Sequence, residues 1–147
     1  MLDWEHIEKY REDNRLEAKK SQGGLPESIW ETYSAFANTV GGLILLGVIE
    51  KEDKSFATVP LDNPDQLAAD FWNMLNRPGV VSANILEPED VDVLESQGNR
   101  IVVVRVPPAR RRPVWIGSDP YTGSYWRHGE GDYRIPADVV KKLLESY

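Results

Sequence analysis

The sequence contains no cysteine and only two histidines, His6 and His128, in 147 residues. Without cysteine there are no disulfides and no thiolate metal ligands, which favours a reducing compartment. Two histidines are too few for the zinc sites that histidine usually builds. The motifs G-x-x-x-x-G-K-[ST] and G-x-S-x-G do not occur either. These absences exclude P-loop nucleotide hydrolysis and argue against nucleophilic catalysis of the serine-hydrolase type.

Long hydrophobic runs are also missing. The longest apolar stretch, residues 43–49, is interrupted by Gly47 and is too short to span a bilayer. The first residues, MLDWEHIEKYRED, lack the basic start and apolar centre of a secretory signal. We therefore expect a cytoplasmic protein with no membrane partner.

Acidic residues outnumber basic ones by 24 to 17, so the formal net charge is -7. This charge counts against a nonspecific polyanion binder, because such proteins neutralise phosphates with excess lysine and arginine. The charge is uneven, however. Seven arginines and three acids lie between Arg100 and Arg134, whereas the segment from Glu50 to Glu95 is strongly acidic. A basic face on an acidic body is one outcome that this distribution allows.

The segment from Ile29 to Glu50 changes its hydrophobic period at Gly41-Gly42. Apolar residues recur at helical spacing from Ile29 to Val40, and the apolar run after the glycines predicts a buried strand. Two glycines at the junction let backbone approach whatever occupies the mouth of the turn. We expect Asn38, in the last helical turn, to point its amide toward the same place.

The rest of the chain predicts alternating helices and strands. Asn63-Pro64-Asp65-Gln66 has the form of a helix start, and Arg100 to Val106 is rich in β-branched residues. Further helices are expected at 3–11 and 135–147, and further strands at 15–20, 55–59, 84–95, 113–117 and 124–128, with a turn at 121–123. The predicted fold is α/β (α+β), a single domain over residues 1–147 with a mixed β-sheet and packed helices. The last helix has no glycine or proline stop, so we expect the N-terminal fragment of a longer protein.

Three carboxylates are candidate metal ligands. Glu12 and Glu17 flank the start of one predicted strand, and Glu50 follows the strand after the two glycines. If these strands are neighbours and Glu12 lies on a turn, the carboxylates meet at one end of the sheet. Hard oxygen ligands of this kind hold Mg²⁺ or Mn²⁺, which can act on a phosphodiester. The alternative is that Glu12 is a solvated helix end and that Glu17 pairs with Lys19 along the strand.

The arginines of the C-terminal third are candidate phosphate ligands. Arg110, Arg111 and Arg112 follow Pro107-Pro108 in a predicted loop, with Arg105 just before them. Guanidinium groups bind phosphates with two parallel hydrogen bonds. Trp115, Tyr121, Tyr125 and Trp126 are interleaved with the arginines, as on surfaces where bases stack. The alternatives are a solvated arginine run and aromatic residues that belong to the core. The segment 127–134, with its two glycines around Glu130, is interpreted as a tight connection.

Several ordered motifs resemble one known family. These motifs are Glu12 with Leu16-Glu17-Ala18-Lys19, Leu25-Pro26, Ser34-Ala35-Phe36-Ala37-Asn38-Thr39 before Gly41-Gly42, Leu46-Gly47-Val48, Arg112-Pro113-Val114-Trp115-Ile116 and Tyr125-Trp126-Arg127-His128-Gly129-Glu130-Gly131. Together they resemble the Schlafen/AlbA-type DNA-binding domain over nearly the whole chain. The resemblance implies an α/β domain that forms the N-terminal part of larger prokaryotic transcriptional regulators.

The resemblance also implies nucleic-acid binding as the leading function. The residues expected to contact nucleic acid are Lys19, Lys20, Asn38, Arg105, Arg110, Arg111, Arg112, Arg127 and Arg134. Similarity to the animal Schlafen branch implies a second function, a divalent-metal-dependent ribonuclease with Glu12, Glu17 and Glu50 as catalytic metal ligands. The chain departs from the family here, because Glu50 stands where the family commonly has aspartate. A third interpretation is a protein-interaction module that forms a homo-oligomer.

Overall fold

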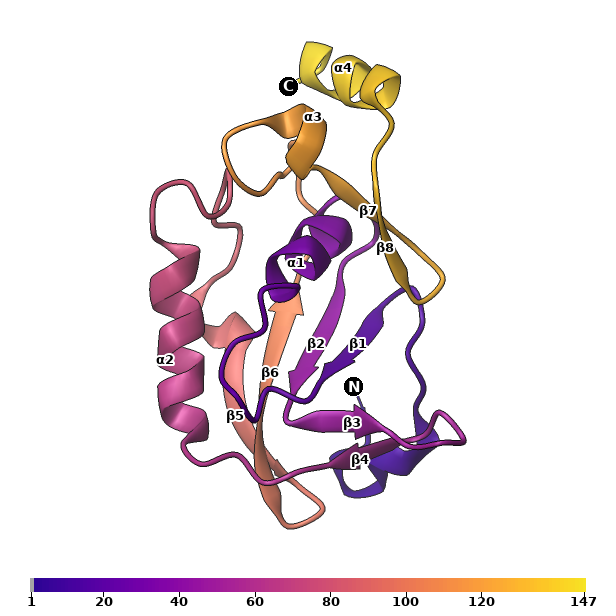
Figure 1. Cartoon of the computed structure of the whole chain (residues 1–147), viewed down its shortest axis with the longest axis vertical. Helices are drawn as coiled ribbons and strands as arrows, with labels where there is room; N and C mark the ends of the chain where they lie inside the picture. Colours follow the sequence, from indigo (N-terminus) through magenta and orange to yellow (C-terminus); the bar gives the residue numbers. More distant parts are fainter. Residues whose placement is uncertain (1) are drawn as a thin grey trace.

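A four-stranded mixed sheet forms the centre of the computed structural model, which describes residues 2–147 (Figure 1). The strand order is β1-β2-β6-β5. Strand β1 (Leu16–Lys19) runs parallel to β2 (Gly42–Leu46), whereas β6 (Asn99–Val106) is antiparallel to both β2 and β5 (Val91–Ser96). The predicted mixed sheet is confirmed. The expected neighbours, the strand after Glu12 and the strand after the two glycines, lie side by side.

Two small antiparallel sheets complete the β-structure. One pairs β3 (Val48–Glu50) with β4 (Phe56–Thr58), and the other pairs β7 (Tyr125–His128) with β8 (Gly131–Arg134). Gly47 has a φ of 91° and separates β3 from β2, so the single strand predicted for this run is two strands. In Figure 1, β3 and β4 lie across one end of the main sheet. The chain changes direction at Gly47, so the end of β3 lies outside the main four-stranded sheet.

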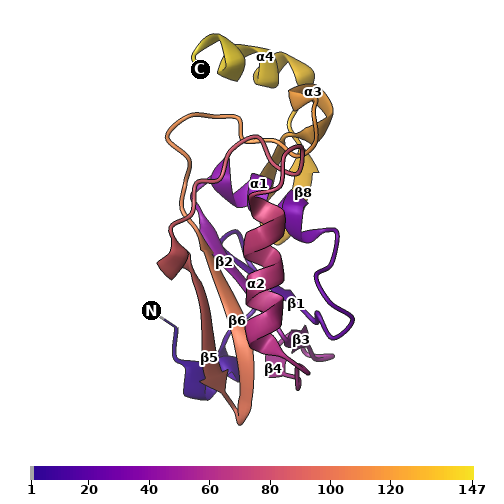
Figure 2. The same ribbon diagram turned by 90° about the vertical axis from the view of Figure 1, so that its left-hand side faces the viewer.

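Helices cover one face of the main sheet more completely than the other. Helices α1 (Ile29–Ala37) and α2 (Pro64–Leu75) pack on the face that carries Ile44 and Val104 (Figure 2). The predicted start of α2 is confirmed, because the Asn63 side chain accepts a hydrogen bond from the Gln66 amide at 3.0 Å. The larger core lies on this face, with aromatic residues of both helices at its centre.

The opposite face carries a smaller core under the N-terminal segment. A 3-10 helix (Trp4–Lys9) buries Ile7 in a cluster with Leu45 and Val103. Because successive strand residues point to opposite faces, Ile44 and Leu45 serve different cores. The sheet is therefore buried on both sides at its centre, as the apolar run predicts.

The C-terminal elements differ in part from the prediction. Residues 113–117 form isolated bridges rather than a strand, and the expected turn at 121–123 belongs to a short helix, α3 (Pro120–Gly123). The last helix, α4 (Ala137–Glu145), lies at one end of the molecule (Figure 1). It buries Val140 and leaves Val139, Leu143 and Leu144 half exposed. Among residues 2–147, no helix has the length and apolar character needed to cross a membrane.

The two glycines between α1 and β2 allow close approach of the chain's own backbone. Gly41 has a φ of 77°, and a Cβ there would lie 2.7 Å from the Val106 carbonyl oxygen. A Cβ on Gly42 would lie 2.8 Å from the Arg15 carbonyl oxygen. The predicted hinge is confirmed, but neighbouring strands occupy its mouth. The helix also ends earlier than its periodicity predicts, and Val40 is 45% exposed.

Asn38 does not face a ligand site. Its side chain is 8% exposed, and its amide oxygen accepts a hydrogen bond from the Val114 N–H at 2.8 Å. Its amide nitrogen donates to the carbonyl oxygens of Val114 at 2.9 Å and Tyr125 at 2.8 Å. The expected nucleic-acid contact of Asn38 is corrected accordingly, because its polar atoms are used to join α1 to the segment before α3 and to β7.

Replacing Asn38 with alanine is expected to destabilise the fold by about 2–4 kcal/mol, because it leaves buried backbone groups without partners. Denaturant unfolding followed by circular dichroism measures the change. The control is Asn73→Ala on the exposed face of α2, which is expected to change stability by about 0.5 kcal/mol or less. Equal effects of the two substitutions would contradict this role of Asn38.

Candidate metal and nucleic-acid sites

Three glutamates from distant segments meet beside the edge of the main sheet. One carboxylate oxygen each of Glu12, Glu50 and Glu130 lies within 4.8 Å of the other two. Glu12 precedes β1, Glu50 ends β3, and Glu130 lies in the turn of the β7–β8 hairpin. We call these three residues the carboxylate cluster. Glu12 and Glu50 converge as the sequence predicts, and their role as metal ligands stays a prediction.

Glu12 is the most perturbed member of the cluster. Its carboxylate accepts a hydrogen bond from the Ala18 N–H at 3.0 Å, along the open edge of β1. Burial is the largest cause that raises the pKa of Glu12 to about 9, followed by hydrogen bonds with the carboxyl groups of Glu17 and Glu50. Glu12 therefore carries a proton at neutral pH when no cation is bound nearby.

Glu17 lies beside the cluster and is held by a buried arginine. The Arg127 side chain is 0% exposed, and its Nη1 lies 2.8 Å from both Glu17 Oε1 and Asp132 Oδ1. Burial opposes the charge of Arg127, but hydrogen bonds to Asp132 and Glu17 outweigh it and raise the pKa of Arg127. Lys19 donates instead to the Ser28 hydroxyl at 3.0 Å. Glu17 thus pairs across the structure rather than with Lys19.

The remaining donors of Arg127 bind backbone. Nε and Nη2 donate to the Asp13 carbonyl oxygen at 3.1 and 2.9 Å, and Nη2 also donates to Leu16 O at 3.2 Å. The guanidinium carbon lies 5.0 Å from the centre of the Phe36 ring. The expected phosphate contact of Arg127 is therefore corrected, since its side chain is fully enclosed and joins β7 to β1.

Two further arginines expected at phosphates have protein partners. Arg112 donates to the carbonyl oxygens of Ala109 at 3.1 Å and Thr39 at 2.8 Å. Arg105 donates to the Glu89 carbonyl oxygen at 3.1 Å and lies 3.7 Å from an Asp92 carboxylate oxygen. The arginines therefore do not form one basic stripe, because several of them are engaged within the fold.

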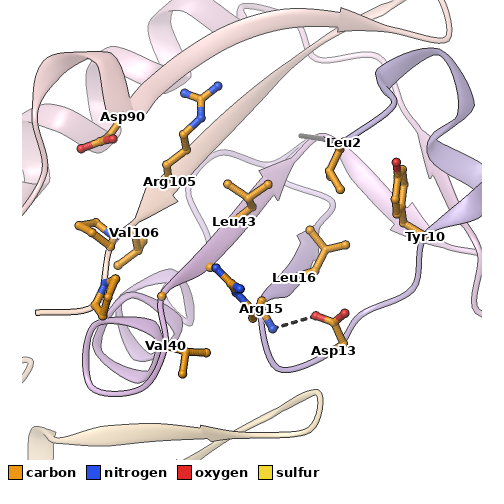
Figure 3. A pocket seen from close by; sticks show the side chains of 14 residues that line it. Leu2, Tyr10, Asp13, Arg15, Leu16, Val40, Leu43, Asp90, Arg105 and Val106 are labelled. Atoms are coloured by element: carbon orange, nitrogen blue, oxygen red, sulfur yellow. Dashed lines mark hydrogen bonds between the residues drawn. The ribbon is translucent and has the colours of Figure 1, made fainter.

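Arg105 also lines a groove of about 610 Å³ on the sheet face opposite α1 (Figure 3). Leu16 and Leu43 lie on its floor, and Arg15 is the second cation on its wall. Asp13 beside it accepts a hydrogen bond from the Arg15 backbone N–H at 2.8 Å. The groove is mainly apolar and carries both signs of charge, so it does not have the character of a phosphate site.

Arg110 and Arg111 remain available for a ligand. Both are exposed and border a second groove, of about 640 Å³, together with Glu87 and Tyr147. Neither side chain makes a hydrogen bond or ion pair with any residue in the range 2–147. Lys20 and Arg134 are also exposed, and their side chains make no hydrogen bond or ion pair in the described part of the chain. Four of the expected phosphate ligands therefore have charged groups without a partner in residues 2–147. They are Lys20, Arg110, Arg111 and Arg134.

The carboxylate cluster fits a divalent cation. Its three ligand atoms are hard carboxylate oxygens, the type of ligand that Mg²⁺ and Mn²⁺ bind, and they are close enough to converge on one ion. Burial and the neighbouring carboxyl groups raise the pKa of Glu12, and a bound cation would favour its ionised form instead. Glu130 was not predicted, because nothing in a glycine-bracketed turn indicates which distant residues it meets.

The fold and this site define an α/β domain with a mixed sheet and carboxylates gathered beside an edge strand. The family model described as "Schlafen, AlbA_2" matches residues 11–136, and the chain belongs to this family. The matched residues include β1, the two glycines and the β7–β8 hairpin. The predicted family is confirmed.

Two solved structures share the fold. One is the N-terminal domain of a RecG-related protein from Nitrosomonas europaea, with a TM-score of 0.57, 23% identity, and coverage of 82% of this chain and 81% of that one. The other is the DIP2311 protein from Corynebacterium diphtheriae, with a TM-score of 0.57, 17% identity, and coverage of 90% of this chain and 24% of that one. No curated protein sequence matches the chain.

Replacing Glu12 with glutamine is expected to stabilise the protein at high pH. The folded-state pKa of Glu12, about 9, lies above the ordinary glutamate value of 4.5, so the folded protein binds more protons between these pH values and loses stability as pH rises. Glu12→Gln removes this loss, and its melting temperature should exceed that of the wild type increasingly from about pH 5 to about pH 9. Thermal melts in chelator measure the difference, with exposed Glu52→Gln as the control. A difference that is independent of pH would contradict the assignment.

Proposed function

We propose that the chain is a nucleic-acid-binding module of a prokaryotic transcriptional regulator, with DNA as its ligand. The observation that carries the proposal is the pair Arg110 and Arg111, exposed, unpaired within residues 2–147 and adjacent at the rim of a groove. Free guanidinium groups are the side chains best suited to bind phosphate oxygens. Membership of the Schlafen, AlbA_2 family supports the same class of function. The Nitrosomonas europaea protein is named as related to an ATP-dependent DNA helicase, which is consistent with it.

The net charge of -7 limits how such a module binds. An acidic body repels the rest of a polyanion, so contact is restricted to the few places where free cations gather. Two arginines neutralise about two phosphates, which gives modest affinity and a shallow dependence on salt. The module therefore contributes part of the affinity of an assembly or of a longer protein.

The double substitution Arg110→Ala/Arg111→Ala is expected to weaken DNA binding and to reduce the slope of log K against log salt by about 2. Fluorescence anisotropy of a labelled oligonucleotide at several salt concentrations measures both quantities. Arg100→Ala is the matched control, because Arg100 is engaged by Asp65 at 2.9 Å. An affinity that does not depend on salt would remove phosphate contact as the basis of binding.

A second candidate function is metal-dependent cleavage of RNA. It is favoured by the carboxylate cluster, which Glu12, Glu50 and Glu130 form beside the Arg127-held Glu17. These residues would hold Mg²⁺ or Mn²⁺ and fix the carboxylates around it. A bound ion of this kind polarises a phosphodiester and lowers the pKa of its bound water. Arg127 holds Glu17 in place through an ion pair of 2.8 Å, so the carboxylate of Glu17 is oriented beside the cluster.

Incubation of structured RNA with Mn²⁺ tests this second function. The wild type should cleave, and Glu17→Gln and Glu130→Gln should each lose about 10- to 100-fold in rate, as for residues that support a metal site. Exposed Glu52→Gln is the control and should retain the wild-type rate. Equal cleavage by all four proteins, or cleavage that persists in chelator, would dismiss the carboxylate cluster as its source.

A further inference from the structure

The outer face of the β7–β8 hairpin carries three aromatic rings that no core uses. The rings of Trp126 and His128 are edge-to-face with centres 5.2 Å apart, and those of His128 and Tyr133 are 6.1 Å apart. Trp126 and Tyr133 are directly opposite each other in the strand register. We call these three residues the aromatic face.

The aromatic face is distinct from the buried aromatic residues of the chain. Trp30 and Trp72 pack against the larger core, and Trp4 packs against the smaller one. Trp126 and Tyr133 belong to neither core in the described residues, and Tyr133 is 56% exposed. Rings of this kind present flat apolar surfaces to a ligand.

The hairpin holds these rings in place from its other side. Arg127 lies between Trp126 and His128 in sequence and points inward, where it binds Glu17 and Asp132. Asp132 also accepts a hydrogen bond from the Thr32 hydroxyl of α1 at 2.6 Å. The hairpin is therefore anchored to both β1 and α1, and its outer rings are fixed relative to the main sheet.

A glycine next to the turn gives Tyr133 its position. A Cβ on Gly131 would lie 2.7 Å from Tyr133 ring atoms, so the ring lies against the backbone at this point. The adjacent residue, Glu130, is a member of the carboxylate cluster. The aromatic face and the cluster are thus parts of one hairpin.

Charge on this hairpin favours a polyanion with accessible bases. Asp132 is turned inward to Arg127, so the outer face carries no carboxylate of the strands, and Arg134 is exposed at the hairpin's base. On a chain of net charge -7, a strand face without carboxylates and with Arg134 at its base repels a nucleic acid less than the acidic segments do. Aromatic side chains bind unpaired bases by stacking, whereas bases in a duplex are covered by their neighbours.

We propose that the aromatic face of Trp126, His128 and Tyr133 stacks with unpaired bases of a single-stranded nucleic acid. This inference rests on the proposed nucleic-acid binding and specifies its ligand as single-stranded. Stacking has little dependence on base identity, so the face reads the single-stranded state rather than a sequence.

The test compares three labelled probes of equal length on the wild-type chain by anisotropy: a single strand, its duplex, and a single strand with abasic sites that keeps every phosphate. The single strand should bind at least about fivefold more tightly than the abasic strand, because one stacked base is worth that much or more. It should also bind more tightly than the duplex. Running the set as RNA and as DNA covers both sources of the same chemistry.

Substitutions then locate the effect. Tyr133→Leu should weaken binding of the single strand about 5- to 100-fold without changing that of the abasic strand, whereas Tyr133→Trp should retain it. The control is Tyr121→Leu, at another exposed tyrosine, 44% exposed, in α3. Circular dichroism melts establish that each variant is folded.

The outcomes separate this inference from the function on which it rests. Equal binding of normal and abasic strands, or an unchanged affinity in folded Tyr133→Leu, overturns the aromatic face and leaves nucleic-acid binding intact. Binding of none of the probes by the wild type overturns both. Tighter binding of the duplex than of the single strand also overturns the aromatic face.

Discussion

The buried ion pair network around Arg127 determines how the candidate site is assembled. One guanidinium group, fully enclosed, binds Glu17 of β1, Asp132 of β8 and two backbone carbonyl oxygens near the start of β1. A buried charge is tolerated when its hydrogen bonds are satisfied, and removing one partner leaves an uncompensated charge. The β7–β8 hairpin therefore cannot leave the sheet edge without a large cost in stability, and Glu130 is held near Glu12 as a result.

The same network divides the acids near β1 into two kinds. Glu17 and Asp132 each lie 2.8 Å from the guanidinium group of Arg127. Glu12, Glu50 and Glu130 face one another instead, and in residues 2–147 no cation lies equally close to all three. In the described structure the nearest compensation at Glu50 is Lys54, at 3.8 Å and largely exposed. A proton on Glu12 relieves the repulsion, and a divalent cation would do so more completely. Proton and cation therefore compete for this position, which links any metal binding to pH.

The sequence predicts the parts of the site that depend on chain neighbours or on adjacent strands, but not the contribution of the distant β7–β8 hairpin. The hydrophobic period was sufficient to predict the central strands, and the Asn63 cap was sufficient to predict the start of α2. The convergence of Glu12 and Glu50 followed from strands that proved adjacent. The inward direction of Arg127 was not predictable, because alternation along a short strand does not reveal which face is buried. An arginine in a basic segment looks like a phosphate ligand until its acidic partners, over one hundred positions away for Glu17, are located.

The arrangement also limits how the proposed nucleic-acid binding would work in an acidic domain. Within residues 2–147, five of its ten arginines neutralise its own acids or bind its own carbonyl groups, and this weakens long-range attraction to phosphate. The proposed binding would then depend on short-range contacts, namely stacking on exposed rings, a few free guanidinium groups and any cation that the carboxylates hold. Each of these acts within a few ångströms and depends on the ligand's local structure. Such a domain is suited to discriminate between forms of nucleic acid rather than to hold any polyanion tightly.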